Sequence, residues 1–337
     1  MKKSILLLLF VVSLILSACQ TPTENIENFL SITVTTYNDA ETLESGMVTT
    51  VYSLGLENNE IENKWSFERS AQYPLAVYSK YDNSVYYTQR VDNDVSGKGD
   101  QLFSKSLTTG ETLQLSEDMF GINYIVPLNA DQIVYVAAKK QSRILSVFLY
   151  DKNTDSTTMA NLPKDMSIQL LSYNAFTGKL IGSGRFENEE LAAAEVSNQG
   201  KGQRFIPPNH YIFDFTEFND VKLLYKTENM LIQRLASDSD NNILFTQADT
   251  YRGWEPEFYT YHYNVKKNKL KPLENLDASL YISEFLYCAD DNLYFIGVDE
   301  FNEEQNPRGI YSYNLSTKEI KLIFTSEDGW INNFCLF

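Results

Sequence analysis

The sequence predicts an all-β fold, a six-bladed β-propeller of four-stranded antiparallel blades, and three observations predict it. A polar turn followed by an apolar strand recurs along the chain, at Asp82-Asn83, Asp131-Gln132, Asp240-Asn241 and Asp290-Asp291, with Thr177-Gly178 as a degenerate copy. A short motif with a polar middle residue lies ahead of each copy and repeats every 46 to 64 residues, as propeller blades do once loops vary. Strands such as Phe258 to Tyr263 alternate with a period of two, and no amphipathic helix of convincing length interrupts the pattern.

The expected elements follow in chain order. The segments Ile32 to Tyr37, Val48 to Leu56 and Ile61 to Phe67 supply three strands of the first blade, which lacks its innermost strand. Later repeats supply four strands each, and a helix is expected at Glu189 to Ser197, inside the long loop of the fourth repeat. The final segment, Trp330 to Phe337, is expected to be the missing strand, because pairing both ends of the chain in one blade removes two open sheet edges.

Composition excludes several classes of protein. The 337 residues are 43% hydrophobic, which supports a large core and argues against a disordered tail or a small disulfide-stapled domain. The formal net charge of −17 repels phosphate backbones, so no nucleic-acid partner is expected. Only three Cys and two His are present, which makes a zinc cluster a poor expectation.

The N-terminal segment has the features of an export signal. Lys2 and Lys3 form a positive region, and the apolar run from Ile5 to Leu16 is too short for a comfortable membrane span. The run ends in Leu16-Ser17-Ala18-Cys19, which resembles the lipobox of bacterial lipoproteins.

The lipobox resemblance implies a lipid anchor. Residues 1–18 would be removed as a signal peptide, and Cys19 would carry a diacylglycerol thioether, with a further acyl chain such as palmitate on its amine. Two acyl chains hold a protein stably on a lipid bilayer. Residues 19–28 would then be the lipidated cysteine and a polar tether, and residues 29–337 the propeller, on the extracytoplasmic side of the cell envelope. The alternative is an ordinary secretory signal whose cleavage site lies beside a cysteine.

The repeat itself resembles that of the six-bladed TolB-type bacterial propellers. Their Asp-Gly-x-x-apolar-aromatic turn is similar to the Asp-Asn-x-apolar-aromatic turn found here. The resemblance covers about residues 29–337 and concerns architecture. No α/β domain is expected ahead of the propeller, so the partners of TolB are not carried over.

In such propellers the innermost strands line a central channel, and this arrangement implies a ligand site at its mouth. The middle residues of the repeated motif would form a polar ring there: Gln72, Asn123, Gln169, Gln233, Ser283 and Asn332. Carboxamides donate and accept hydrogen bonds, so this ring suits a neutral polar ligand. Arg234 and Glu284 would add one charge of each sign. The alternative is that these groups only solvate the channel or bond to neighbouring strands.

The same face is expected to carry the long loops after the second strands. One of these loops contains Arg252 and Trp254, which are residue types typical of binding interfaces. Trp254 could instead cover its own loop. Trp65 and Trp330 are expected to pack between strands.

The remaining reactive residue types are expected to be structural. His210 and His262 have no nearby nucleophile in sequence, and Cys288 and Cys335 are expected to be buried free thiols. The segment Asp92 to Asp100 partly matches a calcium loop but lacks the closing Glu, which favours a solvated acidic loop. We therefore expect no metal and no cofactor.

These features favour a membrane-anchored, non-enzymatic propeller that binds an envelope protein, a peptide or a glycan through its channel face. One alternative is a glycan hydrolase or lyase, which needs a second carboxyl group about 5 to 10 Å from Glu284. The other is a scaffold subunit of an envelope complex, which predicts an apolar patch on the side or bottom of the ring.

Overall fold

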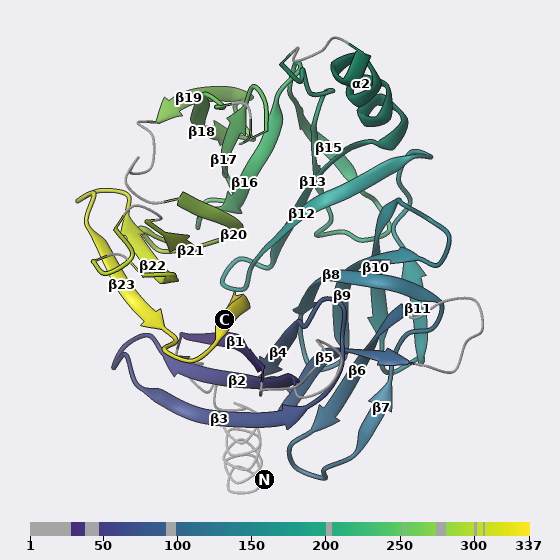
Figure 1. Cartoon of the computed structure of the whole chain (residues 1–337), viewed down its shortest axis with the longest axis vertical. Coiled ribbons are helices and arrows are strands. Elements are labelled where there is room, and N and C mark those ends of the chain that lie inside the picture. The colour runs from purple at the N-terminus through teal and green to yellow at the C-terminus, as the bar shows by residue number, and fades with distance from the viewer. Residues whose placement is uncertain are drawn as a thin grey trace, which may run out of the picture.

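Six four-stranded antiparallel sheets follow one another around a common centre in chain order (Figure 1). The computed structural model describes residues 28–37, 47–91, 99–199, 204–251, 253, 255–273, 281–299, 302–305 and 307–337, without the side chains of residues 283–285. The predicted six-bladed propeller is confirmed.

Each blade runs from an innermost strand at the hub to an outermost strand at the rim. The innermost strands are β24 (Trp330–Leu336), β4 (Ala76–Ser79), β8 (Met119–Pro127), β12 (Met166–Asn174), β16 (Leu231–Ser237) and β20 (Tyr281–Ala289). The second strands are β1 (Phe29–Tyr37), β5 (Ser84–Val91), β9 (Gln132–Lys139), β13 (Lys179–Phe186), β17 (Ile243–Ala248) and β21 (Asn292–Val298). The third strands are β2 (Met47–Gly55), β6 (Gly99–Ser106), β10 (Leu145–Asp151), β14 (Tyr211–Asp214), β18 (Phe258–Asn264) and β22 (Gly309–Asn314). The outermost strands are β3 (Ile61–Glu68), β7 (Thr112–Gln114), β11 (Ser156–Met159), β15 (Lys222–Lys226), β19 (Lys269–Leu273) and β23 (Ile320–Thr325).

The two ends of the ring meet in the first blade, as predicted. Strand β24 pairs antiparallel with β1 and places Phe334 opposite Ile32. Phe29 and Phe337 exchange two backbone hydrogen bonds of 2.9 and 3.0 Å. Their rings stack with centroids 5.1 Å apart. The first blade is therefore built from segments at opposite ends of the sequence.

The hairpins between first and second strands explain the recurring Asp and Asn residues. Asn83, Asn241 and Asp290 have positive φ angles of 49°, 62° and 50°, and Gly178 has one of 71°. Apart from glycine, Asn and Asp tolerate this left-handed conformation best. In the third blade, Asn129 Oδ1 instead accepts hydrogen bonds from two backbone N–H groups of the turn.

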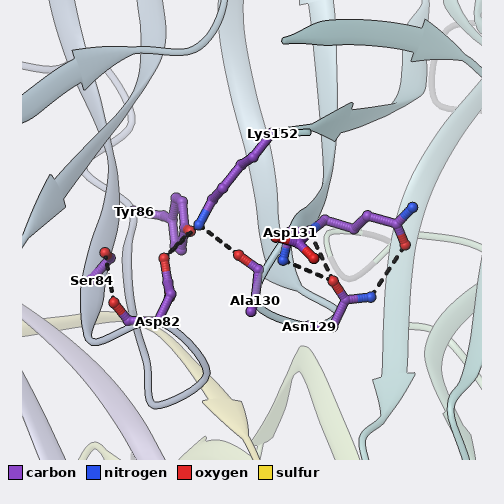
Figure 2. Close-up of polar contacts among 8 residues, drawn as sticks. Asp82, Ser84, Tyr86, Asn129, Ala130, Asp131 and Lys152 are labelled. Carbon is purple, nitrogen blue, oxygen red and sulfur yellow. Dashed lines mark hydrogen bonds and ion pairs between the residues drawn. The ribbon is translucent and has the colours of Figure 1, made fainter. Parts of the chain in front are cut away.

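An ion pair joins the second and third blades at the end of the ring that carries these hairpins (Figure 2). Lys152, in the β10–β11 turn, places Nζ 2.5 Å from Asp82 Oδ2 and 2.8 Å from the carbonyl oxygen of Ala130. Tyr86 donates its hydroxyl hydrogen to the same Asp82 oxygen at 2.7 Å. The Asp82 and Lys152 side chains remain 15% and 28% exposed, so water screens part of the attraction and the pair is worth up to about 1 kcal/mol.

Side chains cross-link innermost strands of non-adjacent blades at the hub. Asn174 Nδ2 in β12 donates to the carbonyl oxygen of Cys288 in β20 at 3.3 Å. Cys335 Sγ in β24 contacts the carbonyl oxygen of Ile125 in β8 at 3.6 Å. Cys288 and Cys335 are buried free thiols, as predicted, and burial raises the pKa of each to about 12. These side chains cross the middle of the hub, so space for a ligand lies nearer the ends of the channel.

Helix α2 (Glu187–Gln199) is inserted between β13 and β14 at the edge of the ring and contains the predicted helix Glu189 to Ser197 (Figure 1). Within the described parts of the chain, no helix has the length and apolar character needed to cross a membrane. The same residues contain no group of three or more His, Cys, Asp or Glu that could hold a metal ion. The predicted signal peptide, Cys19 and the tether up to residue 27 lie outside the described residues, as do residues 92–98 of the calcium-like segment.

Candidate binding site at the channel mouth

Four of the six predicted ring residues lie at β-bulges on innermost strands. In β8, the residues on either side of Asn123 oppose consecutive residues of β9, so Asn123 has no partner in the ladder. The same shift leaves Gln169, Gln233 and Asn332 unpaired in β12, β16 and β24. A bulge adds one residue to a strand and redirects its side chain. The polar motif repeated in the sequence is therefore a repeated bulge.

A comparable irregularity occurs in the sixth blade. The register of β20 against β21 shifts between Ile282 and Leu286, a stretch that includes Ser283 and Glu284. The side chains of Ser283 and Glu284 lie outside the description of the structure, and so do Arg252 and Trp254.

Two adjoining cavities lie at the mouth and share Gln169 in their walls. The smaller has a volume of about 230 Å³ and draws its walls from blades one to four, including Tyr73, Asn123, Gln169, Trp330 and Asn332. The larger has a volume of about 360 Å³ and draws its walls from blades four to six, including Gln169, Arg185, His210, Gln233, Tyr251 and Tyr281. All six blades therefore contribute to one face of the molecule, where four predicted ring residues come together.

The carboxamides of these four residues keep unused hydrogen-bonding capacity. Gln169 Nε2 donates to Ser167 Oγ at 2.9 Å, and Asn332 Oδ1 accepts from Thr35 Oγ1 at 2.6 Å. No side-chain hydrogen bond to another described residue holds Asn123 or Gln233. Each primary amide has two donor hydrogens and an acceptor oxygen, so the cavity walls present donors and acceptors together.

Gln72 does not join this group. It precedes the short strand β4, its side chain is exposed, and it is absent from the walls of both cavities. The buried carboxylate of Asp100 accepts hydrogen bonds from the backbone N–H groups of Gln72 and Tyr73, at 2.9 and 2.8 Å. These bonds hold the turn so that Tyr73 enters the smaller cavity, while a Cβ at Gly121 would lie only 3.2 Å from the Tyr73 ring. In the second blade an aromatic ring thus replaces the expected carboxamide.

Arg234 also departs from expectation, since it adds no free cation to the mouth. It is 8% exposed, and its guanidinium donates to the carbonyl oxygen of Ile282 at 3.0 and 3.2 Å. The guanidinium carbon lies 5.3 Å from the centre of the Phe258 ring. Burial lowers the pKa of Arg234 to about 10, and the residue ties the fifth blade to the sixth.

The prediction that Trp330 packs between strands is wrong. The Trp330 side chain is 57% exposed and lies in the wall of the smaller cavity. The Arg308 guanidinium lies 3.8 Å from the centre of its ring. Trp65, by contrast, packs against Tyr78 with centroids 4.4 Å apart, as predicted.

The larger cavity has a neutral histidine in its wall. His210 is 2% exposed, and its Nδ1 accepts a hydrogen bond from the backbone N–H of Ile232 at 3.0 Å. Burial, with a smaller contribution from the positive charge of Arg185, lowers the pKa of His210 to about 3. The ring is therefore neutral near pH 7, and because Nδ1 accepts, the proton is on Nε2. Among the described residues, Nε2 has no hydrogen-bond partner.

The positive charge of Arg185 is compensated locally. Its Nε lies 3.0 Å from Glu190 Oε2 in helix α2, and Tyr251 donates a hydrogen bond to the other oxygen of the same carboxylate. Of the described residues, no Asp or Glu lines either cavity. Among the described residues, the cavity walls therefore offer amide groups, aromatic rings and a neutral imidazole, with Arg185 as their one charged side chain.

Sequence reasoning placed the loop of Tyr251 on this face but missed Tyr73, Tyr281 and Trp330, although a signal exists for the last two. Trp330 and Tyr281 each precede a predicted ring residue by two positions, as Asn332 and Ser283 show. Residues two apart in a strand share a face. Large aromatic side chains at that spacing could have been assigned to the mouth on this ground.

No protein-family model matches the chain, and no curated protein matches its sequence. Solved structures match its fold. A chain of a nidogen/laminin complex aligns with a TM-score of 0.55 and 12% identity, over 92% of this chain and 98% of that one. TolB from Acinetobacter baumannii aligns with a TM-score of 0.50 and 11% identity, over 97% and 71%.

A puromycin-hydrolyzing peptidase of Mycobacterium tuberculosis also aligns, with a TM-score of 0.50 and 10% identity. The match covers 88% of this chain but 46% of the peptidase. At these identities the likenesses concern the fold, and they show a propeller similar to those of TolB and of peptidases.

Proposed function

We propose that this protein is a lipid-anchored binding protein of the cell envelope, whose propeller takes up a protein, peptide or glycan at the channel mouth. In this proposal residues 1–18 are a signal peptide and Cys19 carries the lipid, as the lipobox resemblance implies. Residues 19–28 tether the ring on the extracytoplasmic side of the membrane. No metal or cofactor is needed.

One observation carries the binding role, namely the four carboxamides placed by bulges around two adjoining cavities. An unpaired residue at a bulge adds no hydrogen bond to the strand ladder. A polar residue nevertheless occupies this position four times, as Asn123, Gln169, Gln233 and Asn332. Concave sites with a few convergent polar groups are typical of ligand binding, and the larger cavity falls within the usual range of about 300 to 1,000 Å³. The described walls of the two cavities carry one charged side chain, that of Arg185, which Glu190 compensates, and this favours a neutral polar ligand.

Photo-crosslinking in the native envelope tests this role. A photoreactive amino acid is placed at Gln233 in the mouth or, as a matched control, at Asn153, an exposed residue of the β10–β11 turn at the other end of the ring. We expect a defined adduct at position 233 that is absent at 153 and weakened by Asn123→Ala. Equal labelling at both positions, or no adduct at 233, contradicts binding at the mouth.

A further inference from the structure

We infer that the ligand of the channel mouth is a neutral glycan and that one of its sugar rings stacks on Trp330. This inference rests on the proposed binding function and gives it a substrate class. Three observations support it. Exposed aromatic rings line the smaller cavity, amide groups lie beside them, and the described walls of both cavities have little net charge.

The Trp330 ring is held in position by a neighbouring side chain and is still exposed to solvent. The Arg308 guanidinium lies 3.8 Å from the ring centre and is itself held by a hydrogen bond to the carbonyl oxygen of Ile331, at 3.2 Å. The ring nevertheless remains 57% exposed in the cavity wall. A tryptophan that is held in place yet left in water has apolar surface available for a partner.

Tyr73 provides a second ring in the same cavity. It is 45% exposed, and its position depends on the Asp100 carboxylate and on the missing side chain of Gly121. The carboxamides of Asn123 and Asn332 line the cavity with the two rings. A pyranose has apolar C–H faces and a rim of hydroxyl groups, so flat aromatic rings beside amides match both parts of its surface.

The larger cavity continues the site without adding net charge. Glu190 compensates Arg185, and His210 is neutral with an unpartnered Nε2–H. A hydroxyl or carbonyl oxygen of a further sugar unit would satisfy this donor, whose burial without a partner is otherwise costly. An acidic glycan would meet a chain of net charge −17. Among the described residues of the cavity walls the only cation is Arg185, which Glu190 compensates, and Arg308 lies behind them against the Trp330 ring. This balance favours a neutral glycan.

Printed arrays of neutral oligosaccharides, acidic oligosaccharides and short peptides test the inference, with the full chain in detergent as the probe. We expect binding to neutral oligosaccharides. Trp330→Ala should weaken it by about ten-fold or more, since aromatic anchors dominate such sites, and Trp330→Phe should keep most of it. Phe176→Ala is the matched control, because Phe176 is 47% exposed in the β12–β13 turn at the opposite end of the ring. Thermal unfolding of each variant establishes that it is folded.

Each of the other possible outcomes overturns a specific part of the inference. Binding of peptides without glycans overturns the glycan and leaves the proposed function standing. A preference for acidic glycans overturns the argument from charge. Glycan binding that survives Trp330→Ala overturns the stacking site. Failure of the wild-type chain to bind any probe, together with no crosslink at position 233, overturns both the inference and the proposed function.

Discussion

His210 is a buried neutral imidazole whose titration should be visible in the stability of the protein. Its pKa is about 3 in the folded chain, against about 6.5 for an unperturbed histidine. Between these values the unfolded state binds more protons than the folded state, so acidification favours unfolding. From pH 7 to pH 5 the free energy of unfolding should fall by about 2 kcal/mol on account of this residue.

Urea unfolding of the wild type and of His210→Gln at both pH values checks this expectation. The variant replaces the fixed Nδ1 acceptor for the Ile232 N–H with a flexible amide and is expected to be less stable at pH 7, so the quantity to compare is the change with pH. Its pH dependence should be shallower than that of the wild type by about 2 kcal/mol. Equal dependence in the two proteins would contradict a depressed pKa.

Closure of the ring depends on strand β24, which carries one fully buried aromatic residue, Phe334, and one largely exposed one, Trp330. Phe334 is fully buried opposite Ile32 and packs against Tyr287 with centroids 5.0 Å apart. Phe334→Ala should therefore lower the free energy of unfolding by about 3–5 kcal/mol. Trp330→Ala, in the same strand but on a largely exposed residue, should lower it by only about 1 kcal/mol, mainly through loss of the contact with Arg308. Chemical denaturation that gave similar losses for both would contradict the described pairing.

The elements also show why the fold could be predicted better than the site. Turn residues and period-two alternation are local signals, and they correctly predicted the blades, the helix Glu189 to Ser197 and the closing strand. A bulge adds one residue to a strand and so reverses which side chains face inward beyond it. The sequence does not show which residue is the added one. Gln233 therefore lines the mouth while its neighbour Arg234 is buried between blades. The short strand β4 likewise leaves Gln72 outside the ring of carboxamides.

On the scale of the whole molecule, the proposal joins an acidic ring to a membrane through Cys19. Cys19→Ala should abolish labelling of the protein by radioactive fatty acid and move it from the membrane fraction to the soluble fraction. The replaced thiol is the atom that would form the thioether, so no partial effect is expected. Cys335→Ala serves as the control, since that thiol is buried at the hub. Label retained by Cys19→Ala would contradict the anchor.

The pairing of β24 with β1 also sets an order of events during synthesis. The two strands are about three hundred residues apart in sequence, so the inner edge of β1 stays without a neighbour until nearly the whole chain has left the ribosome. Contacts between such distant segments form slowly, and an unpaired edge is open to wrong partners. The ring of a nascent chain therefore cannot close until the last strand has been made, which leaves time for capture by a chaperone.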